Sequence, residues 1–384
     1  MQGKLQKNYF KINVSGSVMG LVLAAVTFAE VMKWIGYILI ALLCLMFMIV
    51  VHEFGHFVVG RLLGFKVDEF AVGFGPAILK HKSKKSGIQF SLRCLPLGGF
   101  CAFHGETADD DCVPTKDDFN YHKPWKRILV FIAGAAFNLL SAVVLCTIFF
   151  MAYGDMMPTV VNAYQFEDSA LVQQLQEGDM IIAVDGKSLY NTAVPNDLQQ
   201  RIQKYTDKMT VTIVRNGEQM DVEICIGEYV SKNSDGETVR ANGIGISVKY
   251  QEYKFGFIES LGRSFVFIAK LFGTIFTAIG GVITGVLGIG ETMGGTVTAI
   301  EQIAQISQIG FRGVLFAVCA LSANIAIMNL LPIPALDGAH VVFTAIEWVR
   351  GKPLNRKVEN IIHTVGLICL FLLAIVLDVV HFIS

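Results

Sequence analysis

The chain has 384 residues, of which 53% are hydrophobic and only 16% are charged, and its formal net charge is -1. Soluble domains usually carry about 25% charged residues, so this composition predicts a membrane protein. A nearly neutral chain without a basic field excludes nucleic acid as a partner. The eight cysteines are scattered and form no CxxC pair, which predicts free thiols and no disulfide framework.

Four apolar segments are long enough to cross a membrane, because a spanning helix needs about 20 mostly apolar residues. In chain order these predicted spans are residues 34–63, 128–153, 313–338 and 358–382. Residues 1–33 form an N-terminal extension for which no single structure is predicted. Its apolar stretch 17–29 fits a signal-like segment, half of a hairpin or a helix at the membrane surface.

Residues 64–127, between the first two spans, are predicted to form a β-hairpin followed by a loop. Two strand-like segments, Val67–Leu79 and Ile88–Phe103, flank a charged turn with the sequence KHKSKKSG. The turn and the basic residues around it suit a position outside the hydrocarbon of the membrane.

Residues 158–250 are the soluble-looking part of the chain, with short strand patterns and a predicted helix at 194–205. The pairs Asp185-Gly186 and Asn216-Gly217 are typical of hairpin turns. The segment Ser169–Leu189, SALVQQLQEGDMIIAVDGKSL, resembles the PDZ domain, in which an Ala-rich helix leads into Gly-Asp, a hydrophobic strand and a tight turn.

Residues 255–312 are predicted to form helices at the membrane surface. The stretch 271–289 within them is uncharged and nearly long enough to span, but it is rich in Gly and Thr. The sequence therefore does not decide whether residues 271–289 cross the membrane.

The distribution of Lys and Arg predicts which ends of the spans face the cytoplasm. Residues 350–357, between the last two spans, hold four Lys or Arg, whereas the segment after the last span holds none. That loop is therefore predicted to be cytoplasmic. Alternation then places residues 61–127 inside and residues 154–312 outside, so the first span ends at the cytoplasmic side.

The sequence VHEFGH stands at the end of the first apolar run. His52 and His56 are four residues apart, so a continuing helix places both on one face, where they can bind one metal ion. Glu53 then lies beside the metal, where it can act as a base on water. Polar groups are costly within an apolar helix, which favours a metal site over a solvated surface.

Two histidines leave zinc short of a third protein ligand. Asp337 is the candidate, in the segment NLLPIPALDGAH at the end of the third span and at the same predicted level as His52 and His56. Pro332 and Pro334 prevent a regular helix there, and such backbone is tolerated at membrane depth only where protein or a wet cavity surrounds it. His340 is a rival ligand.

Together, HExxH in the first span, a PDZ-like insert and N-x-x-P-x-P-x-L-D-G late in the chain resemble the site-2 protease family of intramembrane zinc metalloproteases. The similarity is to bacterial regulator-of-sigma-factor proteases of the RseP and RasP type, and it extends over about residues 34–382. It implies Zn²⁺ as the cofactor, with His52, His56 and Asp337 as ligands and Glu53 as the catalytic base.

The same resemblance assigns two asparagines to substrate binding. Asn329 matches the family's Asn that contacts the substrate backbone near the scissile bond. Asn138 ends the segment Gly134–Asn138, which is similar to the family's Gly-Pro-x-x-Asn, with Ala135 in the place of Pro. A hydrogen bond between helices is the alternative role for Asn138.

The expected fold is a polytopic α-helical membrane protein with about four transmembrane helices, a cytoplasmic-side membrane-associated β-hairpin or sheet, and an inserted extracytoplasmic PDZ-like α/β domain. The resemblance implies a protease of the bacterial plasma membrane with its active site toward the cytoplasm. Its partners would be the lipid bilayer and single-pass membrane protein substrates already trimmed on their outer side, such as an anti-sigma factor or a signal-peptide remnant.

Two other functions compete with the protease. A catalytically inactive membrane scaffold could bind peptides through the PDZ-like domain, but the intact HExxH with Glu53 disfavours it. A transporter with polar intramembrane residues is disfavoured because the chain has no internal repeat.

Overall fold

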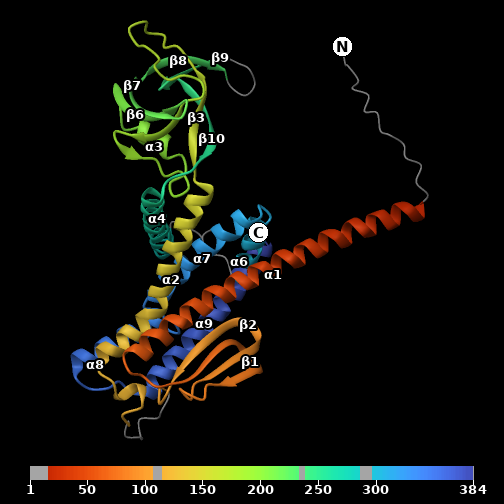
Figure 1. Cartoon of the computed structure of the whole chain (residues 1–384), viewed down its shortest axis with the longest axis vertical. Helices are drawn as coiled ribbons and strands as arrows, with labels where there is room; N and C mark the ends of the chain where they lie inside the picture. The colour runs from red at the N-terminus through yellow and green to blue at the C-terminus, as the bar shows by residue number, and fades with distance from the viewer. Residues whose placement is uncertain (1–15, 107–114, 233–237, 286–295, 384) are drawn as a thin grey trace.

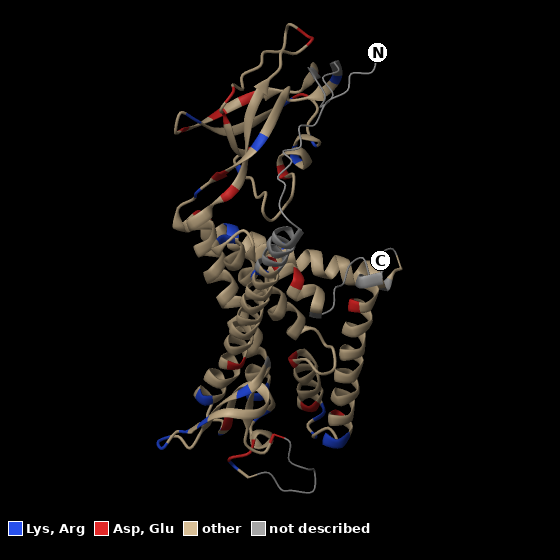
Figure 2. Ribbon diagram, turned by 90° about the vertical axis from the view of Figure 1, so that its right-hand side faces the viewer, with Lys and Arg blue, Asp and Glu red and all other residues tan. Residues whose placement is uncertain are grey.

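The computed structural model describes residues 16–106, 115–232, 238–285 and 296–383. Helices occupy the middle of the molecule, a β-rich block lies at one end, and a small sheet lies at the opposite end (Figure 1). Lys and Arg lie mainly toward the two ends, and the helices between them are largely uncharged (Figure 2). This is the arrangement of a membrane protein with polar parts on both sides of an apolar layer.

Among the described residues, five helices are long and apolar enough to cross a membrane, one more than the four predicted spans. They are α1 (Gly16–Leu62), α2 (Pro124–Tyr153), α4 (Phe257–Ile283), α7 (Phe311–Leu330) and α9 (Arg356–Ile383). The additional helix is α4, which was predicted to lie at the membrane surface. The two shorter helices of this part of the chain are α6 (Thr296–Ser307) and α8 (Asp337–Arg350).

Nearly all of the first predicted span, residues 34–63, lies within a longer helix that begins well before it. Residues 17–29 continue into the first span as one helix, so they do not form a hairpin with it. The 47 residues of α1 extend about 70 Å, more than twice the roughly 30 Å of a bilayer's hydrocarbon. A crossing therefore uses only part of α1, and its apolar span is Glu30–Leu62.

The helix α2 lies at the centre of the bundle and contacts α1, α4, α7 and α8. It begins at Pro124, four residues before the predicted start, because proline suits the first turn of a helix. Gly55 of α1 allows a close approach, since a Cβ there would lie 2.4 Å from the carbonyl oxygen of Ala133. The missing side chain brings the face of α1 that carries HEFGH directly against α2.

The predicted paired strands between the first two spans are confirmed as β1 (Val67–Lys82) and β2 (Gln89–Phe103). The strand β1 bends at Gly73 and Gly75, which both have positive φ. As a result residues 69–72 pair with residues 99–102 on one side and with residues 89–92 on the other. The end of β2 is thus an edge of the folded sheet, and this strand contacts α1. The short η1 (Phe119–Tyr121) follows.

The β block is built from a sheet with the order β10-β3-β4-β6-β7, with β5 beside β4 and a separate β8-β9 pair. The strands are β3 (Asp155–Ala163), β4 (Met180–Val184), β5 (Lys187–Ser188), β6 (Lys208–Arg215), β7 (Glu218–Cys225), β8 (Gly227–Lys232), β9 (Thr238–Gly243) and β10 (Ile246–Tyr253). The helix predicted at 194–205 is the shorter α3 (Asp197–Ile202).

Both predicted hairpin turns of the block are confirmed. Asp185 and Gly186 join β4 to β5, Asn216 and Gly217 join β6 to β7, and all four residues have positive φ. The hydrophobic core of the block includes four fully buried side chains, those of Met157, Ile181, Val211 and Ile213. The resemblance to a PDZ domain remains a prediction.

A buried arginine connects the β block to the helices. Arg263 of α4 is 1% exposed and lies 2.9 Å from the carboxylate of Asp155, which begins β3. It also donates to the carbonyl oxygen of Leu189 and to Glu259, and it stacks on the ring of Phe255. The block is therefore fixed to α4 through one charged side chain.

We expect Arg263→Met to lower the free energy of unfolding by about 3–5 kcal/mol, because Asp155 would stay buried without its cation. Thermal unfolding of the detergent-purified protein measures the effect. The double variant with Asp155→Asn should regain part of the loss. Equal stability of Arg263→Met and the unaltered protein would show that the ion pair does not hold the block.

Candidate metal centre

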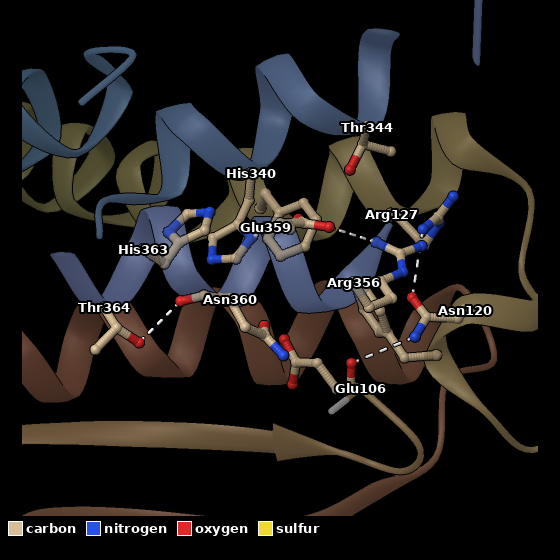
Figure 3. Close-up of a pocket in the computed structure, with 12 residues that line it drawn as sticks. Glu106, Asn120, Arg127, His340, Thr344, Arg356, Glu359, Asn360, His363 and Thr364 are labelled. Atoms are coloured by element: carbon tan, nitrogen blue, oxygen red, sulfur yellow. Dashed lines mark hydrogen bonds and ion pairs between the residues drawn. The ribbon is translucent and has the colours of Figure 1, made fainter. Parts of the chain in front are cut away.

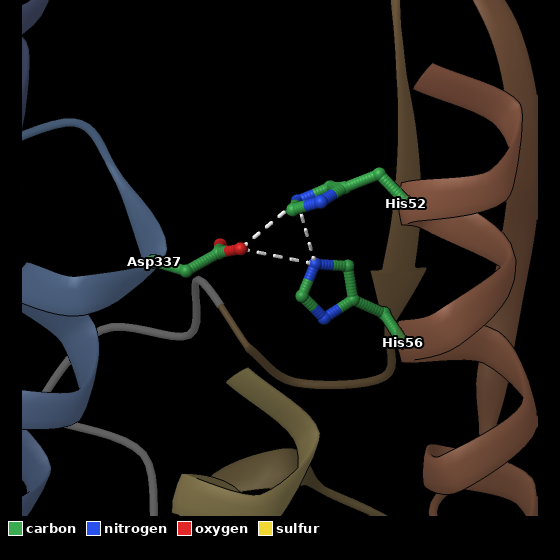
Figure 4. A group of neighbouring side chains, drawn as sticks. All are labelled: His52, His56 and Asp337. Carbon is green, nitrogen blue, oxygen red and sulfur yellow. Dashed lines mark hydrogen bonds and ion pairs between the residues drawn. The ribbon is translucent and has the colours of Figure 1, made fainter. Parts of the chain in front are cut away.

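Three side chains from two distant parts of the chain meet at the end of α1 (Figure 4). His52 Nε2 lies 2.9 Å from Asp337 Oδ2, and His56 Nε2 lies 3.3 Å from the same oxygen. The two Nε2 atoms are 3.2 Å apart. Both imidazoles are buried, and Asp337 is half-buried. The structure thus brings together the three residues that the sequence identified as metal ligands.

The donor set fits zinc. Zinc binds imidazole nitrogen and carboxylate oxygen at about 2.0–2.2 Å in tetrahedral sites, so two ligand atoms of one ion lie about 3.3 Å apart. The three separations between these atoms, 2.9, 3.2 and 3.3 Å, are close to that ligand-to-ligand distance. Three protein ligands also leave the fourth position open, as catalytic zinc sites do.

The two histidines are placed by the helices that carry them. One turn of α1 separates them, and α2 faces them with Gly134. A Cβ at Gly134 would lie 2.4 Å from His56 Nε2 and 2.7 Å from His52 Cε1. Only glycine leaves room for the two rings at this point of α2.

Asp337 is placed by an interruption of the helix. The helix α7 ends at Leu330, and the prolines 332 and 334 prevent its continuation before α8 begins at Asp337. Ala335 in this connection has φ of 79°, a conformation that L residues rarely adopt. Its N–H donates to Nδ1 of His363 on α9 at 3.0 Å, so α9 holds the connection in place.

The charge state of Asp337 suits a metal ligand. Burial by itself raises the pKa of this carboxyl, but the imidazoles of His52 and His56 outweigh burial and hold the pKa below its usual range. The carboxylate is therefore ionised at neutral pH.

Glu53 lies between the two histidines and the edge of the small sheet. The carboxylate of Glu53 lies near the backbone of Cys101 in β2. A Cβ on Gly99, also in β2, would lie 3.3 Å from Glu53 Cγ. The carboxylate thus stands at the sheet edge and close to the charges of the three metal-ligand candidates.

The two asparagines expected at the substrate differ in position. Asn138 is fully buried on α2, with its amide 3.3 Å from His52 Nδ1. Asn329 is half-buried on α7, and its amide donates to the carbonyl oxygen of Ile325 in its own helix. A role of either in substrate binding stays a prediction.

His340, the rival ligand, lies in a second polar group with Glu359 and His363 (Figure 3). The rings of His340 and His363 are stacked, with centroids 3.8 Å apart and planes 11° from parallel. Because the lone pairs of imidazole lie in the ring plane, two stacked rings cannot direct them at one ion. This geometry excludes His340 and His363 as joint ligands in the arrangement observed.

The second group lines a polar cavity of about 320 Å³. Glu106 lines the same cavity, and this half-buried residue lies near His340, His56 and Asp337. Burial raises the pKa of Glu106. Sequence reasoning missed this residue, because an acid in a polar loop carries no pattern that predicts a position beside a site.

Comparison with known proteins agrees with this site. The sequence model of peptidase family M50 matches residues 40–373. A relative from Agrobacterium fabrum is 28% identical over 86% of this chain and 92% of its own length. A relative from Clostridium perfringens is 28% identical over 89% of this chain and 97% of its own length. A relative from a Nostoc species is 30% identical over 89% of this chain and 94% of its own length. All three carry the name "putative zinc metalloprotease".

We expect Gly134→Ala to abolish stoichiometric metal binding, because the added methyl group would occupy the space of both imidazole rings. The measurement is the zinc content of the purified protein by mass spectrometry. Gly36→Ala in α1 is the matched control, since a Cβ there meets no atom within 4 Å. Full zinc content in Gly134→Ala would contradict the geometry of the site.

Proposed function

Because this chain belongs to peptidase family M50, the site-2 protease family, we propose that it cleaves a peptide bond within or near the transmembrane segment of a membrane protein. The family and its donor set make the chain a membrane zinc metalloprotease. The observation that carries the proposal is the meeting of His52, His56 and Asp337 beside Glu53 at the end of an apolar helix.

The residues of the site divide the chemistry between them. His52, His56 and Asp337 would hold zinc, which supplies a Lewis acid that polarises the scissile carbonyl and makes water more acidic. Glu53 accepts a proton from the attacking water and delivers it to the leaving amine. The position of Glu53 at the edge of β2, next to Gly99, keeps its carboxylate beside the histidines.

Water and an unwound substrate must both reach Glu53. The polar cavity beside Glu106 and His340 supports entry of water from the end of the bundle that carries the small sheet. A helical substrate hides its amides in its own hydrogen bonds, so it must become extended before cleavage. The edge of β2 next to Glu53 offers main-chain groups to such a segment, which would add to the sheet as a strand.

The β block supports selection of trimmed substrates. It lies at the end of the bundle opposite the metal centre, and Arg263 fixes it to α4 (Figure 1). With the small sheet in the cytoplasm, the block is outside a bacterial plasma membrane. There it excludes single-pass proteins that still carry a bulky outer domain, so an anti-sigma factor or a signal-peptide remnant is cut only after a first cleavage.

We expect Glu53→Gln to retain zinc and to lose at least about 100-fold of the cleavage rate, because it removes the base but none of the ligands. Cleavage of a trimmed single-pass substrate in detergent is followed on gels, and zinc content is measured on the same samples. His56→Ala should lose both zinc and activity. Cleavage at an unchanged rate by Glu53→Gln would exclude Glu53 as the base and require another catalytic mechanism.

Removing the β block should allow cleavage of an untrimmed substrate. Asp155 pairs with Tyr253 across β3 and β10, so residues 157–251 can be replaced by a short Gly-Ser linker without moving the helices. The deletion protein must still bind zinc and cut the trimmed substrate, which is the control for folding. If it cuts the trimmed substrate alone, the block does not act as the size filter.

A further inference from the structure

An imidazole that binds a metal through Nε2 must carry its proton on Nδ1. That N–H then needs a hydrogen-bond acceptor, above all in a buried site, and the acceptor fixes both the tautomer and the orientation of the ring. The Nδ1 atoms of the two histidines therefore show how each ring is prepared for the metal.

His56 has such an acceptor in the backbone. Its Nδ1 lies 2.7 Å from the carbonyl oxygen of Val130 in α2. A carbonyl oxygen can only accept, so Nδ1 carries the proton and the lone pair of Nε2 faces the centre of the site.

His52 has a different neighbour at the same position. Its Nδ1 lies 3.3 Å from the amide of Asn138, through the Nδ2 end. Two N–H donors cannot bond each other, so this orientation of the amide fits only the tautomer in which Nε2 is protonated and cannot bind metal. The amide oxygen Oδ1 is meanwhile buried with no hydrogen-bond partner among the described residues.

A half-turn about the Cβ–Cγ bond of Asn138 exchanges the two ends of the amide. It places Oδ1 at Nδ1 of His52 and forms the hydrogen bond that the metal-binding tautomer requires. We propose that Asn138 is a positioning residue of the metal site, which accepts a hydrogen bond from His52 Nδ1–H and thereby aims Nε2 at zinc. This inference rests on the proposed function, in which His52 is a zinc ligand.

The surroundings of Asn138 support a fixed position and not contact with substrate. Its side chain is 0% exposed. Its backbone carbonyl oxygen accepts from Ser322 Oγ of α7 at 2.7 Å and from Ser141 Oγ at 2.8 Å. The residue is thus held from α7 on one side and faces His52 on the other, with no open side toward a passing chain.

The test compares zinc affinities of full-length variants by competition with a chromophoric chelator. Asn138→Leu keeps the volume but removes the acceptor, and it should bind zinc about 10–100-fold more weakly. Asn138→Asp keeps an acceptor and should bind zinc about as well as the unaltered protein. Ser322→Ala disturbs the same helix contact without touching the ring, and it should leave zinc affinity unchanged.

Other outcomes overturn the inference in distinct ways. If Asn138→Leu binds zinc normally but raises KM for substrate, Asn138 is a substrate contact. If Ser322→Ala loses as much affinity as Asn138→Leu, helix packing explains the effect. Asn138→Ala, which also lacks an acceptor, replaces the leucine variant if that protein aggregates. His52→Gln distinguishes failure of this inference from failure of the proposed metal site. Normal zinc binding by His52→Gln would refute the metal site itself.

Discussion

Two imidazole nitrogens and a carboxylate oxygen lie within 3.3 Å of one another at the end of an apolar helix, and the rest of the structure depends on this contact. Without a cation, three electron-rich atoms at this distance in a poorly solvated place are costly. A divalent ion removes that cost by accepting a lone pair from each. The fold must therefore hold His52, His56 and Asp337 in register to within a few tenths of an ångström.

Two features of the fold hold the three residues in this geometry: glycines at the contact between α1 and α2, and the interruption between α7 and α8. Glycines 55 and 134 let α1 and α2 approach until the rings lie in the gap between them. The carboxylate comes from a connection in which Ala335 has an unfavourable φ, and His363 of α9 accepts its N–H. Strain in the connection is thus balanced by a hydrogen bond from a helix that contributes no ligand, which is common at sites that need exact geometry.

The two ends of the molecule have different relations to this centre. The edge of β2 and the cavity with Glu106 lie beside it, at the places where the proposed function puts an extended substrate and water. The β block lies at the far end and is fixed to α4 by Arg263 (Figure 1). The β block and the metal centre are therefore separated by the helical layer, which is why the proposed selection of substrates and the proposed chemistry can be tested independently.

The sequence by itself determined the membrane class, four of the five long apolar helices, both tight turns of the β block and the three residues that meet at the candidate metal centre. Apolar runs, Asn-Gly or Asp-Gly pairs and the spacing of His52 and His56 can be recognised in the sequence, because each depends only on residues that are close together in the chain. Only the tertiary structure decided that residues 17–29 extend α1, that β1 and β2 fold back on each other, that the amide of Asn138 faces His52, and that Gly134 and Glu106 lie beside the site. These features arise from contacts between residues far apart in the chain, where no periodicity or spacing carries the information.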